Sequence, residues 1–137
     1  MTAVEQSLKA YMTAFERYEI DAVLGHFVFP CHFVSDGEEV ALMPLATEQA
    51  CRIGIERVFA WHRELGVAGG RVLQQTIVEL TPRLHCLDAQ IQLEDGSGKT
   101  LYDFRGIYTF VRVQDAWRIA AIAHNQIPRL LACLSRG

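Results

Sequence analysis

Hydrophobic and polar positions follow two different periods along this chain, and the period changes near residue 70. In the first half, apolar residues recur every three or four positions, which is the spacing of one face of an α-helix. From Arg71 onward, apolar and polar residues alternate, which is the spacing of a β-strand with one buried face. The pattern predicts helices followed by an antiparallel sheet, an α+β arrangement with the helices on one face.

Two helices are expected before the first strand. Thr2 and Glu5 have the spacing of a capping box, so the first helix begins there and runs to about Tyr18. A second, short helix follows in residues 19–27, EIDAVLGHF. It must end before Pro30, because proline lacks a backbone donor and disfavours helix in the residue that precedes it.

Two short extended segments and a third helix come next. The stretch CHFVS, residues 31–35, is rich in β-branched and aromatic residues and predicts a strand. The stretch VALMP, residues 40–44, predicts a short second strand or arm. Thr47 caps the third helix, which ends at Gly66, and GVAGG, residues 66–70, is expected to form a loop. His62 lies on a polar stripe of this helix and is expected to be solvated.

Four long strands are expected after this loop, in residues 71–80, 84–93, 100–113 and 116–126. All of residues 1–137 are assigned to one domain, since domains commonly hold ~100–150 residues.

Composition and charge limit the range of partners. Half of the residues are apolar, the net charge is -3 and no Lys/Arg cluster occurs, so no nucleic-acid partner is expected. The chain shows neither a signal-peptide pattern nor an apolar run of membrane-spanning length, which predicts a soluble, cytoplasmic protein without a membrane partner. The four cysteines are far apart and no HExxH motif occurs, so we expect free buried thiols, no metal site and no cofactor.

The pairing of the last two strands decides which side chains share a face. If Asp115 and Ala116 form a two-residue turn, Ile107 lies opposite His124 and Arg105 opposite Gln126. One face then carries Asp103, Arg105, Thr109, His124 and Gln126, and the other carries Tyr102, Phe104, Tyr108 and Phe110 against Ala121, Ala123 and Asn125. Both faces are partly apolar while three helices cover one of them, so we expect a homodimer that pairs sheet to sheet.

The order of elements resembles a known superfamily. With the stretches YMTAFERYEIDAVLGHF and AWRIAAIAHNQ, it is similar to the nuclear transport factor 2-like superfamily, which includes ketosteroid isomerases and polyketide-cyclase-like proteins. The resemblance implies three N-terminal helices packed on a strongly curved mixed or antiparallel sheet that forms a conical α+β barrel. It also implies an apolar pocket inside the cone and pairing of two subunits through the outer face of the sheet.

The match to the ketosteroid isomerase pattern is partial. The resemblance places Tyr11 at the position of the tyrosine that hydrogen-bonds the substrate oxygen. Ser35 stands where the pattern has its general-base aspartate, and Thr109 stands where it has a second, protonated acid. Two of the three chemical groups are absent, so isomerisation of ketosteroids by that route is not expected.

Tyr11 and His124 are the candidate catalytic residues of the pocket. His124 is either a general acid or base or a histidine hydrogen-bonded within the sheet, and Tyr11 is either a pocket donor or a core residue. Asp103 and Arg105 form either an inward ion pair that positions a ligand or a surface pair. The candidate ligand-binding residues are Phe15, Phe33, Ser35, Trp61, Asp103, Arg105, Thr109 and Gln126.

Three functions fit these residues. The first is binding of a small apolar or aromatic molecule in the cone, oriented by Tyr11 and His124. The second is a cofactor-independent acid/base enzyme of isomerase, cyclase or dehydratase type, with His124 as base and Tyr11 as oxyanion donor. The third is a non-catalytic dimerisation module whose cone is filled by Phe15, Phe27, Phe33 and Trp61.

Overall fold

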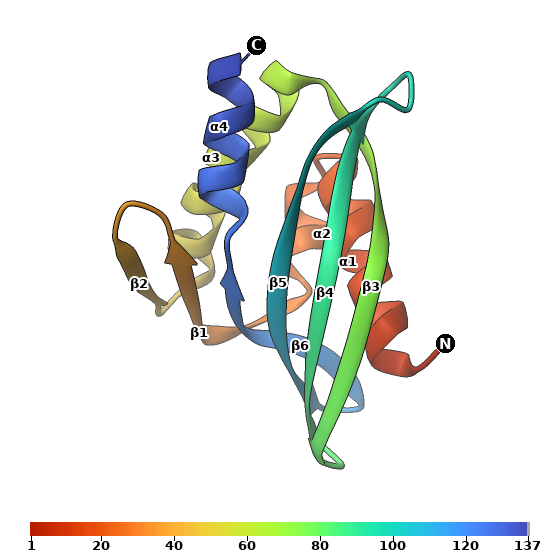
Figure 1. Ribbon diagram of the computed structural model, residues 1–137. Coiled ribbons are helices and arrows are strands. Elements are labelled where there is room, and N and C mark those ends of the chain that lie inside the picture. The colour runs from red at the N-terminus through yellow and green to blue at the C-terminus, as the bar shows by residue number, and fades with distance from the viewer. Residues whose placement is uncertain (137) are drawn as a thin grey trace.

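Six strands and four helices make up the computed structural model, which describes residues 1–136 (Figure 1). In chain order they are α1 (Ala3–Glu16), α2 (Ile20–Leu24), β1 (Phe27–Asp36), β2 (Val40–Leu45), α3 (Glu48–Leu65), β3 (Val67–Thr81), β4 (Leu84–Asp95), β5 (Thr100–Val113), β6 (Ala116–His124) and α4 (Gln126–Arg136). No helix in this range is both long and apolar enough to cross a membrane.

The strands form one curved sheet in the order β2-β1-β6-β5-β4-β3. β1 and β6 run parallel and all other neighbours are antiparallel, so the sheet is mixed. β2 and β3 are its two edges, and the sheet does not close into a barrel. Helices α1 and α2 lie behind the long strands β3 to β5, and α3 and α4 stand beside them, above the hairpin of β1 and β2 (Figure 1). The expected α+β fold, with three N-terminal helices on a curved mixed sheet, is confirmed.

The helix boundaries follow local hydrogen bonding. Thr2 and Glu5 exchange side-chain-to-backbone bonds, so the predicted capping box is confirmed. Thr47 caps α3, which ends at Gly66 with a left-handed φ of 82°. The predicted GVAGG loop is wrong, because Gly66 alone turns the chain and β3 starts at the next residue. Gly70 lies within β3, where a Cβ would come 2.9 Å from Cδ2 of Leu93.

Three segments differ from the expected elements. α2 ends at Leu24, and β1 already starts at Phe27 instead of residue 31. β1 contains Pro30, and its pairing with β6 is irregular between Phe27 and His32, where this proline lies. The helix α4 is missing from the predicted elements. Pro128 lies in its first turn, where no backbone donor is required, and Leu130 and Cys133 bury its inner face.

The hairpin of β5 and β6 has a different register from the predicted one. Gln114 and Asp115 form the tight turn with positive φ of 52° and 63°, and Val113 pairs with Ala116. A shift between Thr109 and Phe110 then sets Tyr108 opposite Ile122 and Gly106 opposite His124. Near His124 the predicted register is therefore wrong by one residue, since Gly106 and not Ile107 lies opposite His124, and a slip of one residue exchanges the two faces of a strand pair.

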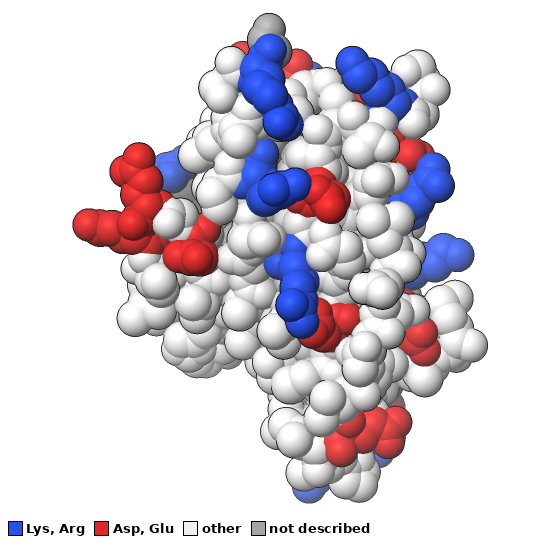
Figure 2. All heavy atoms as spheres, viewed as in Figure 1, with Lys and Arg blue, Asp and Glu red and all other residues white. Residues whose placement is uncertain are grey.

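The concave face of the sheet, which points toward the helices, carries the core. Its fully or nearly buried residues on the two central long strands are Leu87, Ala89, Ile91, Leu93, Tyr102, Phe104, Tyr108 and Phe110. The outer face is visible in Figure 2 as a mainly uncharged surface on which blue and red side chains lie next to each other. All four cysteines are free, as expected; three are buried and Cys86 is half-buried.

Candidate functional site: a cavity between sheet and helices

Two neighbouring rows of residues cross the concave face from strand to strand. Residues paired directly across adjacent strands point to the same side, so each row can be followed through the pairing. One row is large: Met43, Phe33, Ile122, Tyr108 and Leu87 on β2, β1, β6, β5 and β4. The next row is mostly small: Ala41, Ser35, His124, Gly106 and Ala89 in the same strand order. Small residues beside large ones leave a hollow, and the His124 ring stands in it.

Gly106 is required for this arrangement. A Cβ on Gly106 would lie 2.9 Å from Cε1 of Tyr108 and 3.2 Å from its hydroxyl oxygen, closer than carbon atoms normally approach. The Tyr108 ring therefore lies back over Gly106, the residue that pairs with His124. The glycine thus holds the Tyr108 hydroxyl near the row of His124.

The hollow is a cavity of about 300 Å³, which we call the main cavity. Its floor comes from the two rows, and its roof comes from α1 and α3, with Tyr11 and Phe15 from α1 and Ala50, Cys51, Gly54, Ile55, Arg57, Val58 and Trp61 from α3. Met43, Gly54 and Arg57 line the cavity and are also exposed to solvent, so the mouth of the cavity lies between β2 and α3. The cone is therefore not filled by its own phenylalanine and tryptophan side chains.

A second, smaller space of about 40 Å³, the inner chamber, adjoins the main cavity. Four residues line both spaces: Tyr11, Phe15, Tyr108 and Gln126. Glu16 also lines the inner chamber, and partial burial raises the pKa of its carboxyl. The inner chamber is large enough for a water molecule but not for an aromatic ring.

The structure brings most of the candidate site residues together. The wall of the main cavity contains Tyr11, Phe15, Phe33, Ser35, Trp61, His124 and Gln126. These residues come from α1, β1, α3, β6 and α4, so the sequence-distant candidates converge on one space.

Asp103, Arg105 and Thr109 lie outside the main cavity, and their predicted place in it is wrong. All three lie on the outer face by the regular alternation of β5, and the extra residue Ala120 in β6 puts His124 on the opposite, concave face. Arg129 binds the Asp103 carboxylate at 2.6 Å, and Arg105 pairs with Asp88. Both aspartates have pKa values lowered by these arginines, as expected of surface ion pairs.

The tautomer of His124 is set by the start of α4. Its Nδ1 accepts a hydrogen bond from the backbone N–H of Gln126 at 3.1 Å. Nδ1 is therefore unprotonated, and the ring proton is on Nε2. Burial lowers the pKa of His124 to about 4, so the ring is neutral at pH 7. His124 thus presents a hydrogen-bond donor to the cavity, while the nitrogen that a general base would need is already occupied.

Tyr11 and Tyr108 are two further donors in the wall. Within residues 1–136, neither hydroxyl makes a hydrogen bond, although both side chains are buried. Burial raises the pKa of both phenols, so both keep their protons. Their rings pack edge to face, with centroids 6.3 Å apart. The inner wall therefore offers unpaired, uncharged donors to a ligand.

A buried network holds Gln126, the residue next to both spaces. His62 Nε2 lies 2.7 Å from the Tyr102 hydroxyl, and the Gln126 amide donates to the same oxygen at 3.1 Å. The Tyr102 hydroxyl thus accepts from Gln126 and shares a second hydrogen bond with His62 Nε2, while the buried Nδ1 of His62 has no hydrogen-bond partner in the described chain. His62 is 1% exposed, so its predicted solvation is wrong, and burial lowers its pKa to about 4.

Several wall residues were not among the candidates. The wrong register put Tyr108 on the face opposite His124, Ile122 was not singled out, and Arg57 is an exposed helix residue without a motif. Gly106, two residues before Tyr108, could have indicated the position of the Tyr108 side chain. Glycine inside a strand often marks a place where another group packs closely against the backbone. No group of three or more metal-binding side chains comes together in the described range.

The fold and the cavity place this protein in the class of cone-shaped α+β proteins with an internal cavity. The model of the family described as "NTF2-like protein (DUF6841)" matches residues 2–126, and the chain belongs to this family. The expected superfamily is thereby confirmed. Curated proteins include no match to this chain.

Solved structures of similar fold come from several bacteria. An NTF2-like protein of unknown function from Shewanella oneidensis is 14% identical, with a TM-score of 0.72 over 90% of this chain and 97% of that chain. An NTF2-like protein with a cystatin-like fold from Novosphingobium aromaticivorans is 13% identical, with a TM-score of 0.70 over 97% and 85%. A ketosteroid isomerase-like protein from Erwinia carotovora atroseptica is 15% identical, with a TM-score of 0.65 over 91% and 94%. At these identities the likeness concerns the fold.

Proposed function

We propose that this protein binds a small apolar or aromatic molecule in the main cavity. The carrying observation is a space of about 300 Å³ with mainly apolar walls and a few convergent polar groups. That combination is characteristic of small-molecule sites. Tyr11, Tyr108 and His124 would orient an oxygen or nitrogen acceptor of the ligand, because their protons have no partner in the described chain.

Catalysis is not required by this arrangement. The enzyme alternative gave His124 the role of base, and the bond from Gln126 N–H to Nδ1 leaves only a donor at Nε2. The geometry therefore supports binding better than proton abstraction by His124.

A plug at the mouth tests the binding proposal. A Cβ on Gly54 would meet nothing within 4 Å, so a larger side chain can enter the mouth without displacing the fold. Isothermal titration calorimetry with naphthamide, an uncharged aromatic probe, should detect binding to the wild type. In Gly54→Phe the affinity should fall at least about tenfold, since the new ring occupies the space of the probe.

The matched control is Ala60→Phe, which adds the same side chain to an exposed position of α3 outside the cavity wall. It should leave naphthamide binding unchanged. Equal binding by wild type and Gly54→Phe would place the probe elsewhere and reject the main cavity as the site.

The second part of the proposal is a homodimer through the outer face of the sheet. Leu42, Val34, Ala123 and Ile107 form one continuous row across β2, β1, β6 and β5 on that face. Leu42 is 73% exposed, Ile107 41% and Val34 38%. The neighbouring charges are paired within the chain, so two copies of the face would not repel each other.

Sedimentation of the wild type and Ile107→Asp from micromolar to millimolar concentration tests this part. The wild type should be dimeric and the variant monomeric, because an unpaired carboxylate at the centre of the contact would lose its hydration. Asp115→Asn, at the exposed hairpin turn, is the control for a single-residue change of charge. A wild type that is monomeric throughout would reject the dimer.

A further inference from the structure

The main cavity has one charged residue in its wall. Of the residues that line it, His124 is neutral at pH 7, and Arg57 alone carries a full charge. Arg57 lies on α3 one turn after Gly54 and one turn before Trp61, so these three residues follow one another along the mouth. The cavity is thus cationic at its mouth and uncharged further in.

Arg57 makes no ion pair or side-chain hydrogen bond within residues 1–136. The contrast with Arg52 on the same helix is direct, because Arg52 binds Asp21 at 2.8 Å and Glu48 at 3.3 Å. The Arg57 guanidinium therefore keeps its donors available at the edge of an apolar space.

The opposite end of the cavity disfavours an anion. Beyond Tyr11 and Phe15, the inner chamber is lined by Glu16, which carries a carboxyl group. A ligand that entered with a negative group first would bring that group toward this carboxyl and away from water. A negative group that stays at the mouth remains hydrated and lies beside Arg57, so it loses little solvation.

We propose that the ligand is an apolar or aromatic carboxylate whose carboxylate lies against Arg57 at the mouth and whose uncharged end lies between Tyr108 and His124. The inference rests on the proposed binding function and specifies its ligand class. A planar guanidinium fits a carboxylate in a bidentate manner. A doubly charged phosphate fits less well, since one arginine neutralises half of it and the nearby hairpin turn carries Asp36, Glu38 and Glu39.

Three probes with one ring test the inference: naphthoate, naphthamide and naphthylmethylammonium. Calorimetry on the full chain should show naphthoate binding about fivefold more tightly than naphthamide, and the ammonium probe binding most weakly. Arg57→Gln should lower the affinity for naphthoate about fivefold and should affect the uncharged naphthamide less, so the ratio of the two affinities falls toward one. Raising the salt from about 0.01 M to about 1 M should weaken only naphthoate, because the ion pair at the mouth is screened.

Arg52→Gln is the matched control, since it removes the same charge from the same helix outside the cavity wall. It should change neither affinity by more than about twofold. Equal affinities of naphthoate and naphthamide, or an unchanged naphthoate affinity in Arg57→Gln, would overturn the carboxylate class and leave the binding function standing. Failure of all three probes to bind at millimolar concentration would overturn both.

Discussion

The two faces of strands β4, β5 and β6 use polar side chains in opposite ways. On the concave side, the hydroxyls of Tyr108 and of Tyr11 on the covering helix α1, and Nε2 of His124, have no partner among the described residues. On the outer face, Arg105 and Asp88, and Arg129 and Asp103, satisfy one another. The three donors on the concave side border the open space of the main cavity, where a ligand can pair with them, whereas the buried side-chain nitrogen without a partner in the described chain is Nδ1 of His62. The paired surface charges need no such ligand.

The largest expected effect compares one residue type on the two faces. Ile91 is 1% exposed on the concave face, and Ile107 is 41% exposed on the outer face. Ile91→Ala should lower the free energy of unfolding by about 4 kcal/mol, because it removes methyl groups from a closed core. Ile107→Ala should cost less than about 1 kcal/mol in dilute protein. Urea unfolding at micromolar concentration measures both.

Equal losses in these two variants would contradict the comparison. They would mean that the outer face is as fully packed as the core even in dilute solution. The concentration dependence of the Ile107→Ala midpoint separates that case from a defect within one chain.

Acid should weaken the concave side first. The pKa values of His62 and His124 fall from 6.5 to about 4 in the folded protein, so between these values the unfolded chain binds more protons. Stability is therefore complete above pH 6.5 and falls as the pH drops toward 4. The loss is about 3 kcal/mol for His62 and smaller for His124, which reaches the cavity. The carboxylates of Asp88 and Asp103, with lowered pKa values, lose their contribution only at lower pH.

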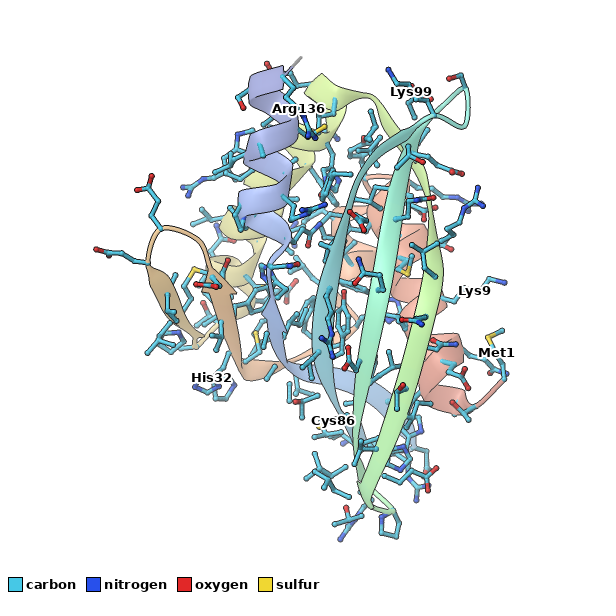
Figure 3. All side chains as sticks on the ribbon, in the orientation of Figure 1. Met1, Lys9, His32, Cys86, Lys99 and Arg136 are labelled. Carbon is cyan, nitrogen blue, oxygen red and sulfur yellow. The ribbon has the colours of Figure 1, made fainter. Side chains whose placement is uncertain are left out.

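Urea unfolding at pH 7 and pH 5 checks this prediction. His62→Gln keeps a polar partner for Tyr102 and should reduce the difference between the two pH values. His32→Gln is the control, since His32 is exposed and projects from β1 away from the helices (Figure 3). A stability that is flat from pH 7 to pH 5 would contradict the buried, neutral state of His62.

A smaller effect distinguishes two tyrosines on the same face of β5. Tyr102→Phe should cost about 2 kcal/mol, because His62 and Gln126 both lose their partner. Tyr108→Phe removes a hydroxyl without a partner and should change the stability by less than about 0.5 kcal/mol. It should instead weaken naphthamide binding. If Tyr108→Phe destabilised the protein as much as Tyr102→Phe, its hydroxyl would have a structural role and not a binding role.

The sequence was sufficient for most of the elements, but not for α4 or for the faces of one hairpin. Helical spacing placed Tyr11, Phe15 and Trp61 on inward stripes, and these positions lie in the cavity wall. Alternation in β5 is equally regular in either register, so nothing in the pattern marks the shift between Thr109 and Phe110. The extra residue lies in β6, and it puts His124 on the face opposite Asp103 and Arg105. The helix α4 and the bond that fixes His124 depend on tertiary packing, which periodicity does not report.

The smallest expected effect concerns the outer face. Arg105 and Asp88 are 62% and 33% exposed, so Arg105→Gln should change the stability by less than about 1 kcal/mol, and by less still at high salt. This small change in stability is informative, because it distinguishes a polar group that is already hydrogen-bonded within the chain from one that is available to a ligand. Urea unfolding and sedimentation of Arg105→Gln, each at low and high salt, measure it. A tenfold change in the dimerisation constant would show that Arg105 contacts a second copy of the chain. The outer face would then also hold polar groups whose partners lie on another molecule.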